Sequence, residues 1–157
     1  MKTKQFSIFL FLVFSFAAFV NNQAFAQKQK LTMANLKGSD YMGCGCSFQN
    51  LTEAKKPQST KIVFWSEDRN SAILNVNGKD TEFKIVKEGK RPINQKIGSR
   101  FSDEYAANGI TVKIDYLITR VCLKGEEDCE ATFYDVMITA TKGELKTIVK
   151  TKGACGC

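Results

Sequence analysis

The sequence contains no histidine. Ser-His-Asp and Cys-His catalysis both need an imidazole as the base, so neither mechanism is available to this chain. Metal sites that use a histidine ligand are excluded for the same reason. Glycine-rich phosphate-binding motifs of the P-loop and dinucleotide types are also absent. We therefore expect a protein that is not an enzyme.

The N-terminus carries the three-part pattern of a secretory signal peptide. Lys2 and Lys4 form a positive segment, an apolar run extends from Phe6 to Val20, and a small-x-small cleavage site follows at Ala24-Phe25-Ala26. The apolar run is shorter than the roughly 18 residues of a membrane-spanning helix. This length disfavours the alternative, an uncleaved membrane anchor.

Cleavage after Ala26 would divide the chain into a signal peptide, residues 1–26, and an exported part, residues 27–157. The exported part has the length of a single domain with one core. It contains no later apolar segment long enough to span a bilayer. We expect a protein of the periplasm or the extracellular medium.

Short alternating segments predict an all-β domain. The clearest hairpin runs from Ser71 to Val86 around Asn77-Gly78, a dipeptide typical of the type I′ turn. Two longer strands are expected from Ile110 to Val121 and from Ala131 to Thr141. Their apolar faces should pair Val112 with Ala140, Ile114 with Ile138, Tyr116 with Val136 and Ile118 with Tyr134.

A further strand is expected from Leu145 to Val149, with Leu145 beside Ala140 and Val149 beside Val136. The basic segment from Lys87 to Asn108 reads as irregular, with at most a turn or two of helix around residues 102–107. No segment has a sustained helical period. The fold class is an antiparallel meander closed into a barrel or a sandwich and stabilised by disulfides.

All six cysteines lie in the expected exported part, where an oxidising compartment favours disulfides. Cys122 and Cys129 flank one hairpin loop and should bond to each other. A strictly cross-strand bond between them would shift the strand register by one residue, so we expect a β-bulge in this loop. The remaining four form two copies of one tripeptide, Cys44-Gly45-Cys46 and Cys155-Gly156-Cys157.

The two Cys-Gly-Cys units should lie side by side in space, with the glycines allowing their backbones to approach. Two structural disulfides between the units are the first interpretation, and one of them would close a loop of about 110 residues. The alternative is a soft-metal site for copper(I) or zinc, in which all four thiolates converge. Thiol–disulfide exchange is a third possibility. No cofactor is expected under the first interpretation.

Five basic residues suggest a surface that binds anions. They are Lys87, Lys90, Arg91, Lys96 and Arg100. An acidic protein or an anionic envelope component such as lipopolysaccharide would suit them. Lysines in loops and edge strands also prevent aggregation, which is the alternative explanation. Nucleic acid is disfavoured, because only Phe101 and Tyr105 are near enough to stack on bases.

The general layout is similar to that of small secreted β-barrel inhibitors of lysozyme: a signal peptide, short alternating strands and few disulfides. The resemblance is one of layout, and it assigns no residue a role. We expect a non-catalytic secreted binding or inhibitor module with structural disulfides. The alternative function is metal binding or thiol exchange through the Cys-Gly-Cys units.

Overall fold

The computed structural model describes residues 30–38, 41, 43–55, 61–123, 126 and 129–157. The expected signal peptide and its cleavage site lie outside these ranges. The described elements are β1 (Met33–Ala34), β2 (Gly45–Asn50), the 3₁₀ helix η2 (Glu53–Lys55), β3 (Phe64–Ser66), β4 (Ser71–Val76), β5 (Lys79–Lys87), β6 (Arg100–Ala107), β7 (Ile110–Arg120), β8 (Ala131–Lys142) and β9 (Leu145–Gly156).

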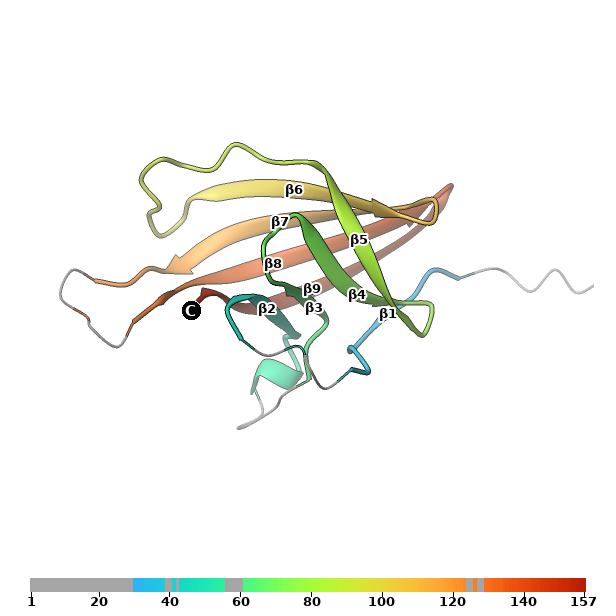
Figure 1. The fold of residues 1–157 in the computed structure, drawn as a ribbon, viewed down its shortest axis with the longest axis horizontal. Coiled ribbons are helices and arrows are strands. Elements are labelled where there is room, and N and C mark those ends of the chain that lie inside the picture. The colour runs from blue at the N-terminus through green and yellow to red at the C-terminus, as the bar shows by residue number, and fades with distance from the viewer. Residues whose placement is uncertain (1–29, 39–40, 42, 56–60, 124–125, 127–128) are drawn as a thin grey trace, which may run out of the picture.

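Strands β2 to β9 form a closed eight-stranded antiparallel barrel (Figure 1). Each of these strands pairs with its neighbour in sequence, and β2 pairs with β9 to close the ring. The extra strand β1 pairs with β4 next to β3, so two short strands share one edge of β4. The predicted all-β antiparallel meander is confirmed, and it closes as a barrel. Among the described residues, no helix is long and apolar enough to cross a membrane.

The barrel interior is filled with side chains from alternate positions of the strands. Phe101 stacks on Tyr116 with ring centroids 4.4 Å apart, and Phe48 stacks on Phe64 at 4.9 Å. Apolar residues of β7 and β8 supply a large part of the core, in the predicted pairs: Val112 with Ala140, Ile114 with Ile138, Tyr116 with Val136 and Ile118 with Tyr134. A bulge between Ile118 and Arg120 follows them, at the end of β7 and just before the loop.

The β4–β5 hairpin has the predicted turn. Asn77 and Gly78 have positive φ values of 52° and 79°, as a type I′ turn requires. The resulting register places Ala72 opposite Phe83 and buries both side chains in the core. Turn type and apolar alternation therefore agree on one pairing.

Two sequence-based predictions of local structure are wrong. The segment suggested as a turn of helix is strand β6, whose inward positions include the buried, charged Asp103. The β8–β9 register differs by two residues from the expected one, since Ala140 lies opposite Thr147 and Ile138 opposite Val149. A two-residue turn at Gly143-Glu144, with Gly143 at a φ of 56°, sets the observed pairing.

Three tyrosines inside the barrel should make the fold sensitive to alkali. Burial raises the pKa of Tyr105 to about 12, and it raises the pKa of Tyr116 and Tyr134 above the ordinary tyrosine value. An unfolded tyrosine ionises near pH 10, before these folded ones do. The stability that the buried, neutral tyrosines contribute is therefore fully present below about pH 10 and is lost as the pH rises toward 12.

We expect Tyr105 alone to account for roughly 2–3 kcal/mol of this loss by about pH 12. Urea unfolding at pH values from about 8 to 12, on the native chain and on Tyr105→Phe, measures it. The variant should be less stable near neutral pH, because the Tyr105 hydroxyl donates a 3.1 Å hydrogen bond to the Arg69 carbonyl. Its stability should nevertheless fall less steeply with pH. Equal slopes for the two proteins would contradict the assignment.

Candidate functional site: the loop end of the barrel

One end of the barrel carries its longer connections and all three disulfides. We call it the loop end. It comprises the β5–β6 loop (residues 88–99), the β7–β8 loop (residues 121–130), and the ends of β2 and β9. Figure 1 shows these two loops and the C-terminus at the same end, opposite the short β6–β7 and β8–β9 turns.

The two Cys-Gly-Cys units lie in the strands that close the barrel, and we call them together the clasp. Cys46 of β2 is directly opposite Cys155 of β9, and the two are bonded with their Cα atoms 4.0 Å apart. Cys44 bonds Cys157 just beyond the strand ends, with a Cα–Cα distance of 4.3 Å. The predicted proximity of the units is confirmed. The bonds fasten the first barrel strand to the last.

The glycines of the clasp are required by the neighbouring backbone. Gly45 has a φ of 135°, and a Cβ atom there would collide with the carbonyl oxygen of Ser66 on β3. A Cβ atom at Gly156 would collide with the carbonyl oxygen of Glu130. The two glycines face each other across the β2–β9 pair. A side chain at either position would therefore push an adjacent strand away from the clasp.

The two clasp bonds differ in exposure. Cys46 and Cys155 are buried and belong to the core, whereas Cys44 and Cys157 are exposed. All four sulfurs are bonded, so metal binding here would first need both bonds to be reduced. No group of three or more potential metal ligands is present among the residues that the structure describes. The metal alternative remains a prediction for the reduced protein.

The third disulfide joins Cys122 to Cys129 within the β7–β8 loop, as expected. In the same loop the Glu126 carboxylate accepts a 3.1 Å hydrogen bond from the Leu123 backbone N–H and forms an ion pair with Arg120. The backbone hydrogen bond is the main cause that lowers the pKa of Glu126. Together the three disulfides indicate an oxidising compartment, either the periplasm or the cell exterior.

The β5–β6 loop is anchored to the barrel by a buried carboxylate. Asp103 is fully buried on β6 and accepts hydrogen bonds of 3.0 Å from the Gly89 backbone N–H and from the Arg91 guanidinium. The same guanidinium lies 4.9 Å from the ring centroid of Phe101. At its other end, the loop is held against β7, because the Gly98 backbone N–H donates a 2.8 Å hydrogen bond to the Ile118 carbonyl.

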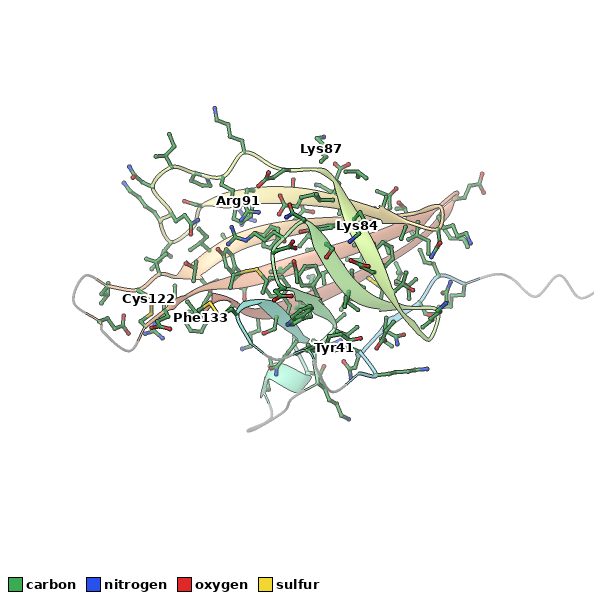
Figure 2. The ribbon with its side chains drawn as sticks, in the orientation of Figure 1. Tyr41, Lys84, Lys87, Arg91, Cys122 and Phe133 are labelled. Carbon is green, nitrogen blue, oxygen red and sulfur yellow. A yellow bond between two sulfur atoms is a disulfide. The ribbon has the colours of Figure 1, made fainter. Side chains whose placement is uncertain are left out.

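The structure separates Arg91 from the other four residues of the predicted anion-binding surface. Its side chain is only 17% exposed and points toward the barrel, whereas Lys87 points outward (Figure 2). Lys87 lies 3.5 Å from Glu104. Lys90, Lys96 and Arg100 are exposed and form no ion pair with any described residue. Arg91 therefore positions the loop, and anion binding by the others remains a prediction.

Sequence reasoning missed the exposed aliphatic side chains at this end. Ile93 is 97% exposed and Ile97 67% exposed in the β5–β6 loop, while Leu123 is 73% exposed in the β7–β8 loop. Val86, at the end of β5, is 61% exposed. These four exceed every other large apolar residue in the described part of the chain. Two isoleucines within five residues of a polar loop were the available signal, because exposed apolar residues that occur together mark a contact surface, whereas single ones are ordinary.

An open cleft of about 450 Å³ lies between the two loops and the clasp. Gln95 borders it from the β5–β6 loop, and Cys122 and Cys129 border it from the β7–β8 loop. Cys155 of the clasp forms part of its wall. The loops and the clasp thus surround one concave surface whose rim is held by disulfides.

The chain was compared with protein families, curated proteins and solved structures. None of the three comparisons finds a significant match.

Proposed function

We propose that this protein is an exported, non-catalytic binding module that contacts its partner through the loop end. The observation that carries the proposal is that three of the four most exposed large apolar side chains among the described residues lie in the two loops at one end of the barrel (Figure 1). Exposed apolar residues scattered singly over a surface are ordinary, whereas a local group of them marks a contact surface. Ile93 and Ile97 in the β5–β6 loop and Leu123 in the β7–β8 loop form such a group at the loop end.

The way the loops are held supports the same proposal. Asp103 anchors the β5–β6 loop, and the Cys122–Cys129 bond closes the β7–β8 loop. The clasp secures the strands beneath them. A surface ordered before binding loses less conformational entropy when the partner arrives. The disulfides are then structural parts of a binding module and take no part in chemistry.

Export fits the three disulfides, which need an oxidising compartment. We propose that the signal peptide is removed after Ala26 and that the functional protein begins at Gln27. The absence of histidine and the engagement of all six sulfurs in bonds are consistent with a binding role.

Hydrogen exchange with and without an envelope fraction from the producing cells should locate the contact surface. We expect the amides of residues 88–99 and of Leu123 to exchange more slowly in the presence of the fraction, because a bound partner excludes water from these loops. The opposite turns at Asn108-Gly109 and Gly143-Glu144 serve as internal controls and should be unchanged. Slower exchange at those turns alone, or at no site, would refute the assignment of the loop end.

A further inference from the structure

The loop end combines exposed aliphatic side chains with exposed cations, and we propose that its partner is the surface of an anionic lipid bilayer. This inference rests on the proposed function and names the class of partner. In this arrangement the barrel stands with its loop end on the membrane. Ile93 and Ile97 enter the boundary between headgroups and acyl chains, with Leu123 beside them. Lys90, Lys96 and Arg100 lie among the anionic headgroups.

The first argument is that basic and apolar side chains alternate along the β5–β6 loop. Lys90 precedes Ile93, Lys96 is adjacent to Ile97, and Arg100 follows, all with exposed side chains. Interfacial binding uses this combination, in which apolar side chains are buried to a shallow depth and basic side chains attract anionic lipids. Each cation near such a surface strengthens binding about fivefold.

The kinds of residue present carry the second argument. Hot spots of protein–protein interfaces are enriched in tryptophan, tyrosine and arginine, whereas leucine and valine are under-represented. The most exposed apolar residues here are isoleucine, leucine and valine. Aliphatic side chains suit an acyl-chain environment, which asks for no shaped pocket. A lipid surface therefore fits this end of the barrel better than a protein partner does.

Two of the carboxylates that would oppose membrane binding are paired within the protein, whereas Glu130, exposed in the β7–β8 loop, forms no ion pair with a described residue. Glu126 in the β7–β8 loop is paired with Arg120, and its carboxylate also binds the Leu123 backbone. Glu88 in the β5–β6 loop lies 3.6 Å from Arg91. Lys90, Lys96 and Arg100 are exposed, form no ion pair with a described residue and are available to an external anion. The β5–β6 loop is thus the side of the loop end that approaches the bilayer most closely.

Vesicle co-sedimentation of the exported chain tests the proposal. We expect binding to vesicles of phosphatidylglycerol and phosphatidylethanolamine, no binding to vesicles of phosphatidylcholine alone, and weaker binding as salt is added. Ile93→Ser should weaken binding about tenfold, since burying one aliphatic side chain is worth roughly that factor. Lys96→Gln should weaken it about fivefold.

Matched control variants lie on the barrel wall near the opposite end. Ile148 and Lys146 are exposed on β9, and Ile148→Ser and Lys146→Gln should bind the anionic vesicles as the native chain does. Equal losses in the control and loop variants would overturn the orientation proposed here, as would absence of binding to anionic vesicles. If vesicles are not bound while an envelope fraction still slows exchange at the loops, the partner is an envelope component other than the phospholipid bilayer, and only the lipid proposal fails.

Discussion

Removing both bonds of the clasp should lower the free energy of unfolding by about 4–5 kcal/mol, far more than the two single removals combined. The bonds join residues 113 and 109 apart in sequence, so either one alone closes nearly the whole domain into a loop. In the chain-entropy model, the second bond adds little once the first is present. The two bonds are therefore redundant in limiting the unfolded chain.

Three variants separate these contributions. Cys44→Ser with Cys157→Ser removes the exposed bond and should change stability by less than about 1 kcal/mol. Cys46→Ala with Cys155→Ala removes the buried bond and should cost about 1–2 kcal/mol, because it also deletes two sulfurs from the core. The variant with all four replacements should lose much more than the sum. Denaturant unfolding of each variant measures the difference.

The third disulfide provides the matched control. Cys122 and Cys129 are only 7 residues apart, so their replacement by serine should cost about 2–3 kcal/mol. This loss should add to the effect of either clasp variant, since closing a loop of 7 residues hardly shortens the loops of 109 and 113 residues that the clasp closes. The two clasp bonds themselves should not be additive. If the four-residue variant lost only the sum of the two single-bond losses, the two bonds would not be redundant in limiting the unfolded chain.

Replacing Arg91 should produce the second large effect. Arg91→Met removes the charged partner of Asp103, which is fully buried inside the barrel. An uncompensated buried charge typically costs 3–5 kcal/mol, and we expect a loss of about 3 kcal/mol because the Gly89 N–H still binds the carboxylate. The β5–β6 loop should also lose its attachment, which hydrogen exchange in residues 88–99 detects.

A second change tests whether the loss comes from the stranded charge. Asp103→Asn keeps an acceptor for Gly89 and removes the charge, so the double variant with Arg91→Met should be more stable than Arg91→Met alone. Lys90→Met is the control, since Lys90 is exposed in the same loop. It should change stability by less than about 0.5 kcal/mol. A double variant no better than Arg91→Met would mean that Arg91 acts through packing on Phe101.

Some features of this protein follow from local patterns in the sequence. Asn77-Gly78 allows the positive φ values of a type I′ turn, and the apolar alternation on each side demands the same register. The β7–β8 pairing was predictable because four apolar residues on each strand match without a gap. The Cys122–Cys129 bond follows from placement around one loop.

Other features could not be read in this way. Asp103 interrupts the inward apolar series of β6, so the strand resembled a polar segment. Its burial makes sense only with Arg91, the residue 12 positions earlier that pairs with the Asp103 carboxylate. The β8–β9 register was misjudged because a shift of two residues keeps every side chain on the same face. Only the turn at Gly143 distinguishes the two pairings.

The sequence by itself was enough to predict three things. Six cysteines indicated an oxidising compartment, the alternating segments indicated antiparallel strands, and the two Cys-Gly-Cys units were expected to lie close together. Tertiary structure decided that the units fasten the first barrel strand to the last, with one bond buried and one exposed. It also decided that Arg91 faces the barrel while Ile93 and Ile97 face outward. Burial depends on what the closed barrel brings next to each residue, and residues far apart in the chain supply those neighbours.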